Sequence, residues 1–152
     1  MIRPARPGEA EALTDLALRS KAYWGYDAAF MAACRAELTV TPAQAASGLV
    51  QVYEEGGRAF GFYLLEVRNG SADVAMLFVE PAAIGRGIGR ALWQHLVAEA
   101  RRLELAKVTI ESDPNAEAFY RAMGATTVGT APSASIPGRR LALMELALGE
   151  DM

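Results

Sequence analysis

The feature that most limits the fold is a strand, a loop and a helix that follow one another in mid-chain. Residues 72–79 form an apolar run that ends before Pro81, and residues 87–103 carry apolar side chains at helical spacing. Residues 107–111 then read as another strand. Because a single helix connects these two strands, they must run parallel. We expect them to splay apart around a ligand, beside the end of the first strand.

The loop between this strand and this helix contains three alternating glycines, Gly85, Gly87 and Gly89. Glycine lets backbone N–H groups approach a ligand that a Cβ atom would keep away. A helix start adds unpaired N–H groups and the positive end of the helix dipole. The loop therefore predicts an anion site suited to a pyrophosphate. Arg86 and Arg90 favour this interpretation over a turn in which the glycines serve packing alone.

Two common phosphate-binding motifs do not fit this loop. A dinucleotide fingerprint would place its third glycine at position 90, which is Arg90. A P-loop would need Gly-Lys-Ser or Gly-Lys-Thr after the turn, and this sequence does not occur there. A doubly wound dinucleotide fold would also repeat the strand–helix–strand unit, which this chain contains once.

The rest of the chain predicts an α+β fold in one domain that spans residues 1–152. N-terminal helices precede an antiparallel meander, and a hairpin follows the strand–helix–strand unit. The further elements that we predict are an edge strand over 2–5, helices from Pro7-Gly8 to about Trp24, over 27–38, from Thr41-Pro42 and over 115–123, and strands over 49–54, 59–67, 125–130 and 140–148.

Charge and composition narrow the class of function. The net charge of −3 argues against nucleic acid as a partner and fits a cationic substrate such as an amine. One cysteine, Cys34, and one histidine, His95, argue against an intrachain disulfide and a metal site built from these residues. No apolar run approaches the length that spans a membrane, so we expect a cytoplasmic protein without a membrane partner. The sequence leaves a homodimer open.

Two segments resemble the signatures of the GNAT superfamily of N-acetyltransferases. The family carries Gln/Arg-x-x-Gly-x-Gly/Ala after a Val-x-Pro, and Val79-Glu80-Pro81 and Gly87-Ile88-Gly89 match this pattern. The first position of the signature falls on Ile84, which is neither Gln nor Arg. That departure removes a polar side chain and leaves the backbone N–H groups of the loop in place.

The second segment lies downstream, between Asn115 and Ala125. It is similar to the family's Asn-x-x-Ala-x-x-Phe-Tyr-x-x-x-Gly-Phe pattern, but it lacks the two residues between Ala118 and Phe119 and has Ala125 in place of the last phenylalanine. The elements occur in the family's order over nearly the whole chain. The resemblance therefore implies a GNAT-like fold: a mixed, mostly antiparallel sheet with one splayed pair of parallel strands.

The resemblance also implies transfer of an acetyl group from acetyl-CoA to a primary amine of a small molecule or a peptide, without a metal. The pyrophosphate would bind the backbone of the glycine loop, and the pantetheine amides would pair with the free strand edge. The residues that we expect to bind the cofactor are Phe78, Val79, Ile84, Gly85, Arg86, Gly87, Ile88, Gly89, Arg90, Asn115, Ala118 and Tyr120.

Catalysis by direct attack would need a general base for the amine and a general acid for the departing thiolate. Tyr120 matches the family's tyrosine and is the predicted acid. Asp73 falls where the histone-acetyltransferase branch of the family carries its glutamate base. Glu111 and Asp113 compete for that role, because they follow the second parallel strand. Glu80 is a further candidate for the base, although we expect it on the rim of the site.

The acceptor pocket is predicted at a helix–helix connection. Trp24 and Tyr26 flank a glycine there and suit an acceptor pocket in the family layout, although a cluster that caps the core explains Trp24 equally well. Arg139 is either a contact for a carboxylate of the acceptor or a solvated loop charge, and we expect the latter. The alternative function is a non-catalytic acyl-CoA-binding or sensor domain with the same fold, which would have no need of the Tyr120 phenol.

Overall fold

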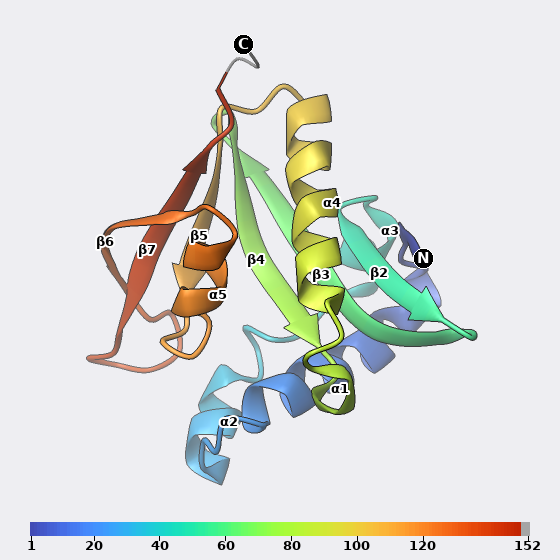
Figure 1. Cartoon of the computed structure of the whole chain (residues 1–152). Coiled ribbons are helices and arrows are strands. Elements are labelled where there is room, and N and C mark those ends of the chain that lie inside the picture. The colour runs from blue at the N-terminus through green and yellow to red at the C-terminus, as the bar shows by residue number, and fades with distance from the viewer. Residues whose placement is uncertain (150–152) are drawn as a thin grey trace. The chain divides into compact units, whose positions relative to one another are not determined.

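The structure is a computed structural model that describes residues 1–149. Within these residues seven strands form one sheet in the order β1-β2-β3-β4-β5-β7-β6 (Figure 1). The β4–β5 pair is parallel, and the pairs β1–β2, β2–β3, β5–β7 and β6–β7 are antiparallel. The strands are β1 (Ile2–Pro4), β2 (Val50–Glu55), β3 (Arg58–Arg68), β4 (Ser71–Val79), β5 (Lys107–Ser112), β6 (Thr126–Pro132) and β7 (Arg140–Ala147).

Helices precede the meander and connect the strands that follow it. They are α1 (Ala10–Ala22), α2 (Ala28–Cys34), α3 (Pro42–Ala46), α4 (Ile88–Arg102) and α5 (Glu117–Ala122), with short 3-10 helices η1 (Pro7–Glu9) and η2 (Pro81–Ala83). This order confirms the predicted α+β class and the parallel strand–helix–strand unit. The second helix is shorter than the predicted span of 27–38, because the chain continues as turns after Cys34.

The chain folds as two compact units, and β3, β4 and α4 each run from one unit into the other. The first unit contains Met1–Leu64 and Met76–Leu92. The second contains Leu65–Ala75 and the chain from Trp93 onward. The single domain over residues 1–152 stays a prediction.

Ion pairs and caps fix the N-terminal segments of the first unit. The Arg3 guanidinium donates to Glu9 and to Glu54, each at 2.8 Å, and so joins β1 to η1 and to β2. Pro4 lies on the edge strand of the sheet, where its missing N–H is tolerated. Thr41 caps α3, as predicted, and shares a capping box with the third residue of that helix.

The second unit is built around β5, β7 and the later turns of α4. Its buried apolar side chains include Leu96, Val97, Ala100, Val108, Ile110 and Met144. Gly124 has a φ of +102° and ends α5, as predicted for a glycine just past a helix. Leu103, the last apolar residue of the helical pattern predicted over 87–103, is 37% exposed, because α4 ends one residue earlier.

Helix α4 approaches β3 closely at Gly61 in the first unit. A Cβ atom on Gly61 would lie 3.0 Å from the Phe78 carbonyl oxygen, 3.0 Å from Leu92 Cδ1 and 3.2 Å from Ile88 Cγ2. The carbonyl belongs to the backbone of β4, so it cannot turn away as a flexible side chain can. Glycine at this position therefore allows the first turns of α4 to pack against β3.

We predict that Gly61→Ala lowers the free energy of unfolding by about 1–3 kcal/mol, the usual cost of overpacking a core. Gly129→Ala is the matched control, because Gly129 also lies in a strand and its added Cβ would meet open space. Denaturant unfolding of both variants measures the difference. Wild-type stability of Gly61→Ala would contradict the prediction, since it would mean that the contact relaxes without cost.

Candidate active site

The glycine loop leaves its backbone open to a ligand. Gly85 and Gly87 have φ angles of +91° and +81°, which glycine adopts without the strain that a side chain would add. A Cβ atom at either position would meet no other atom within 4 Å. The two glycines are therefore explained by backbone conformation and open space, and packing against a neighbour does not require them.

The start of α4 adds hydrogen-bond donors to this loop. The Ala91 N–H donates to the Gly87 carbonyl at 3.1 Å, which makes Gly87 the N-cap of a helix of 15 residues. The N–H groups of the first turn have no acceptor within the helix, and the aligned peptide dipoles make this end positive. Figure 1 shows β4 leading through η2 and the loop into α4. The segment therefore offers several N–H groups and positive potential to an anion.

The two isoleucines of the loop differ in exposure. Ile88 is 2% exposed, and its side chain lies next to Gly61 in the core of the first unit. A ligand can therefore reach Ile88 only through its backbone. Ile84, which replaces the usual Gln or Arg, is 45% exposed, so the change from the family pattern affects a surface side chain.

Two arginines carry positive charge beside the glycine loop. The Arg86 guanidinium carbon lies 5.5 Å from the centroid of the Phe60 ring, and Arg86 Nη2 lies 2.7 Å from Glu55 Oε1. About half of each of these two charged side chains is exposed, so this ion pair is weak. Arg90 is exposed and has no carboxylate partner within residues 1–149.

Glu80 lies inside the first unit, and its predicted place on the rim is wrong. It is 7% exposed, and its carboxylate accepts hydrogen bonds of 3.0 and 2.7 Å from the guanidinium of Arg19 on α1. Its N–H donates to the Phe60 carbonyl at 2.7 Å. The Arg19 guanidinium holds the pKa of the Glu80 carboxyl below its usual range. Sequence reasoning missed this pair because the partner lies 61 residues away.

Phe78 and Val79 end β4 at the loop, as predicted. The Phe78 ring packs against Phe62, with 6.2 Å between centroids, and both Phe78 and Val79 are partly exposed. The register of β4 with β5 ends at the pair Asp73 and Thr109, before either strand ends. The last residues of β4 therefore lie beyond that ladder, where their backbone can pair with an extended ligand.

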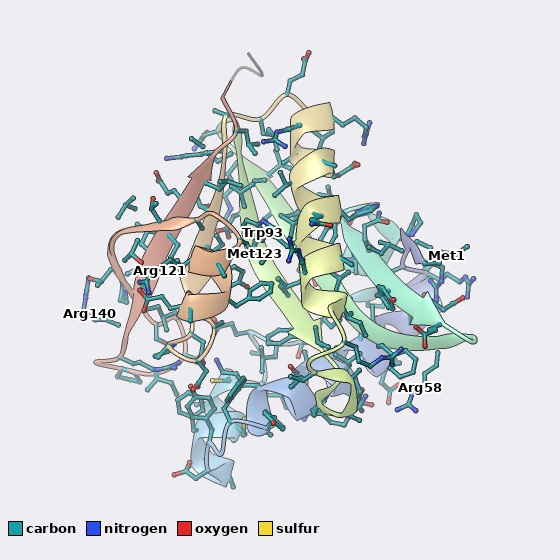
Figure 2. The ribbon with its side chains drawn as sticks, in the orientation of Figure 1. Met1, Arg58, Trp93, Arg121, Met123 and Arg140 are labelled. Atoms are coloured by element: carbon teal, nitrogen blue, oxygen red, sulfur yellow. The ribbon has the colours of Figure 1, made fainter. Side chains whose placement is uncertain are left out.

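Tyr120 is buried in an aromatic cluster of the second unit. Its ring centroid lies 5.6 Å from that of Trp93, which extends from α4 in Figure 2, and 5.2 Å from that of Phe119. Burial, and then the negative charge of Asp113, raise the pKa of the Tyr120 hydroxyl above its usual value. The structure therefore gives Tyr120 a packing role in the core of this unit.

Arg139 is ion-paired, so the predicted solvated loop charge is wrong. Arg139 Nη2 lies 3.2 Å from Asp113 Oδ2, and both side chains are less than one fifth exposed. The backbone and side-chain amides of Asn115 donate to Asp113 Oδ1 at 2.8 and 2.9 Å. Asp113 thus joins the segment before α5 to the loop before β7, and Asn115 helps to hold it there.

The two predicted bases of the second unit have different surroundings. Asp73 accepts a hydrogen bond of 3.0 Å from the Thr109 hydroxyl on β5, and burial is the main cause that raises the pKa of Asp73. It precedes Val79 by six residues, which is roughly 20 Å of extended strand. Glu111 is exposed and lies opposite Leu143 in the β5–β7 ladder.

The connection between α1 and α2 carries more aromatic surface than predicted. Trp24 is 49% exposed and contacts the Tyr23 ring at 5.1 Å, so it does not cap the core. Tyr26 stacks on Phe30 with centroids 4.0 Å apart, and Lys21 Nζ lies 5.3 Å from the Tyr26 centroid. Sequence analysis missed Phe30 and Lys21, although the four-residue spacing of Tyr26 and Phe30 was a signal.

Metal-binding groups and membrane-spanning helices also bear on the function of residues 1–149. Across residues 1–149 no group of three or more His, Cys, Asp or Glu side chains could hold a metal ion. None of the helices described combines the length and the apolar character that crossing a bilayer demands. Ala118 adds only an exposed methyl group on α5.

Comparisons of sequence point to one family. A family model for the acetyltransferase (GNAT) domain matches residues 10–146. The chain is 34% identical over 127 residues to the peptidyl-lysine N-acetyltransferase YiaC of Escherichia coli (strain K12). This match covers 82% of each of the two chains. The chain belongs to the GNAT acetyltransferase family. It is also 26% identical over 147 residues to the 5-NmdU N-acetyltransferase of Pseudomonas phage PaMx11, covering 95% of this chain and 97% of that one.

Solved structures agree with this GNAT assignment at the level of the fold. The crystal structure of the PaiA N-acetyltransferase from Thermoplasma acidophilum in complex with coenzyme A matches with a TM-score of 0.78. The match covers 97% of this chain and 98% of that chain at 16% sequence identity. The GNAT-like fold and the acyltransferase class predicted from the sequence are therefore confirmed.

We predict that Glu80→Gln lowers the free energy of unfolding by about 1–2 kcal/mol at neutral pH, because Arg19 loses a charged, bidentate acceptor. The loss is limited because Arg19 is half exposed and water can solvate it. The folded protein lowers the pKa of Glu80, so the pair stabilises the fold above the unfolded pKa of about 4.3. This stabilisation is lost as the pH falls through the folded-state pKa.

Urea unfolding at neutral and at acid pH tests this expectation, and the difference between variant and wild type should shrink in acid. Glu66→Gln is the control, because its ion pair with Arg68, at 3.2 Å, is largely exposed and should contribute little at either pH. A loss for Glu80→Gln that is equally large at both pH values would contradict the electrostatic explanation.

Proposed function

We propose that the protein is an N-acetyltransferase that moves the acetyl group of acetyl-CoA to a primary amine. The observation that carries this proposal is the glycine loop, whose backbone is open at Gly85 and Gly87 in front of a helix of 15 residues. CoA contains a pyrophosphate, which suits N–H donors that no side chain covers. Membership of the GNAT family and the coenzyme A in the PaiA structure support the assignment.

In this proposal the backbone from Ile84 to Arg90 binds the pyrophosphate. The free edge of β4 at Phe78 and Val79 pairs with the pantetheine amides in the manner of an added strand. An N–H group near Val79 stabilises the oxyanion that forms when the amine attacks the thioester carbonyl. Asn115, Ala118 and Tyr120 are proposed cofactor-binding residues of the second unit.

The reaction forms a C–N bond and breaks the C–S bond, so the amine loses a proton and the thiolate gains one. We propose that Tyr120 supplies the proton to the thiolate. A phenol of ordinary pKa, about 10, is already protonated at neutral pH, and burial raises the pKa of Tyr120 further. The phenol is therefore a weaker acid than a free thiol of pKa about 8.5, so transfer depends on a close hydrogen bond to the sulfur.

For the base we propose Asp73, with Glu111 as the competing candidate. A carboxyl with a raised pKa is a better proton acceptor than an ordinary one, and Asp73 has this property because it is half-buried. Its place in the paired part of β4 would require a bridging water. The larger loss of turnover at low pH, in Asp73→Asn or in Glu111→Gln, identifies which of the two carboxylates acts.

The acceptor that we propose presents a primary amine on a small molecule or on a peptide lysine. The relative YiaC is a peptidyl-lysine N-acetyltransferase, and the net charge of −3 favours a cationic partner. Trp24 and Tyr26 are the proposed contacts. The Lys21 ammonium lies 5.3 Å from the centroid of the Tyr26 ring, so an acceptor ammonium would have to take its place there.

The alternative is a non-catalytic acyl-CoA-binding or sensor domain. Release of the CoA thiol from acetyl-CoA, followed with a panel of lysine peptides and small amines, separates the two functions. Turnover that depends on an added amine supports the enzyme. Tight binding of acetyl-CoA without turnover on any amine supports the alternative and would overturn our proposal.

We predict that Gly87→Val lowers the affinity for CoA by well over tenfold, because a branched side chain fills the space that the pyrophosphate needs. Valine at a φ of +81° also strains the backbone. Gly48→Val is the matched control, since Gly48 has a φ of +83° and open space but lies outside the loop. Calorimetric titration with CoA measures both variants, and equal affinities would rule out the loop as the binding site.

We predict that Tyr120→Phe lowers turnover by roughly 10²-fold, the low end for general acid catalysis, with little change in CoA affinity. Phenylalanine keeps the ring contact with Trp93 and removes the proton. Tyr120→Ala should instead reduce stability, because it removes a buried ring. Initial rates and thermal unfolding of both variants separate the roles, and wild-type turnover of Tyr120→Phe would exclude the acid.

A further inference from the structure

A cationic cluster of the first unit joins Arg86 of the glycine loop to a second arginine, Arg58, which has no role in the chemistry described above. The guanidinium carbons of Arg58 and Arg86 lie 5.0 and 5.5 Å from the centroid of the same Phe60 ring. We call Arg58, Phe60 and Arg86 the arginine clamp. Arg58 begins β3, and Figure 2 shows its side chain at that end of the strand.

The charges of the arginine clamp are only partly balanced. Arg86 pairs with Glu55, which is half exposed, whereas Arg58 has no carboxylate partner within residues 1–149. The charge of Glu80 also acts on Arg58, but both carboxylate oxygens of Glu80 accept from Arg19. Because two guanidinium groups lie beside the same ring, a phosphate dianion near them would be attracted more strongly than one carboxylate.

The clamp also has the right chemistry for a phosphate. A guanidinium group above an aromatic ring keeps N–H donors at its edge, and these match the oxygens of a phosphate in a bidentate arrangement. Phe60 is only partly exposed, so the ring fixes the two side chains and reduces the entropy that they lose on binding. Glu55 is the resident anion that an incoming phosphate would displace from Arg86.

We infer that the arginine clamp binds the 3′-phosphate on the ribose of CoA, and this inference rests on the proposed binding of CoA at the glycine loop. Arg86 stands between Gly85 and Gly87, so one clamp residue belongs to the segment proposed for the pyrophosphate. The 3′-phosphate is one ribose away from that pyrophosphate. It is a phosphomonoester, which carries nearly two negative charges at neutral pH.

Calorimetric titration with CoA and with 3′-dephospho-CoA tests the clamp. We expect the wild type to bind CoA about tenfold more tightly or better, as charge-assisted hydrogen bonds to one more phosphate would give. Arg58→Ala/Arg86→Ala should bring the ratio of the two affinities close to one, because it should weaken the binding of CoA far more than that of 3′-dephospho-CoA. Glu55→Gln should increase the ratio, because Arg86 then has no competing anion.

Arg102→Ala is the matched control, because Arg102 is also exposed and paired with a carboxylate, Glu99, but lies at the other end of α4. It should keep the wild-type ratio. A wild-type ratio in Arg58→Ala/Arg86→Ala would overturn the inference while CoA binding at the loop stands. Failure of the wild type to bind either ligand would instead overturn the proposed function and the clamp with it.

Discussion

The open glycine loop depends on one residue that is fixed just before it. Glu80 donates its N–H to β3 and accepts two hydrogen bonds from Arg19 on α1, so the chain leaves β4 in a defined direction. At its other end, the loop is fixed by the close approach of α4 to Gly61. Between these two anchors Ala83 is buried and its carbonyl accepts from the Arg86 N–H at 3.3 Å, whereas Gly85 and Gly87 have open space beside them at positive φ.

Burial assigns different roles to ion pairs of the same kind in the first unit. The Glu80 carboxylate of the Arg19–Glu80 pair is buried, so loss of Arg19 would leave a buried charge without its partner. We therefore regard this ion pair as part of the framework of the fold. The Arg86–Glu55 pair has the same separation of 2.7 Å, but water reaches both partners. An exposed pair of this kind contributes little and can exchange partners. The protein therefore keeps an exchangeable ion pair at Arg86 in the loop and a fixed one at Glu80 just before it.

The sequence predicted the elements of the fold well because their signals are local. The change from alternating to helical spacing, the Pro81 boundary and the alternating glycines all lie within a few residues of what they determine. The ends of helices were less predictable, as Leu103 shows. The missed features of the site are pairings between distant segments: Arg19 with Glu80, and Arg139 with Asp113. A charged residue in a sequence does not reveal which distant partner will remove it from water.

Tyr120 shows how packing and chemistry compete for one side chain. Its ring is enclosed by Trp93 and Phe119, and that enclosure is the main reason why its pKa rises. A weak acid such as this phenol gives its proton to the thiolate only where the surroundings strongly disfavour the negative charge on sulfur. A thiolate forming in a water-poor site meets this condition, because burial raises the proton affinity of the sulfur as it does that of the phenol. The difference between the two pKa values can then stay small, although each lies above its value in water. The buried position of Tyr120 is therefore compatible with the acid role, provided that the sulfur is buried to a similar degree.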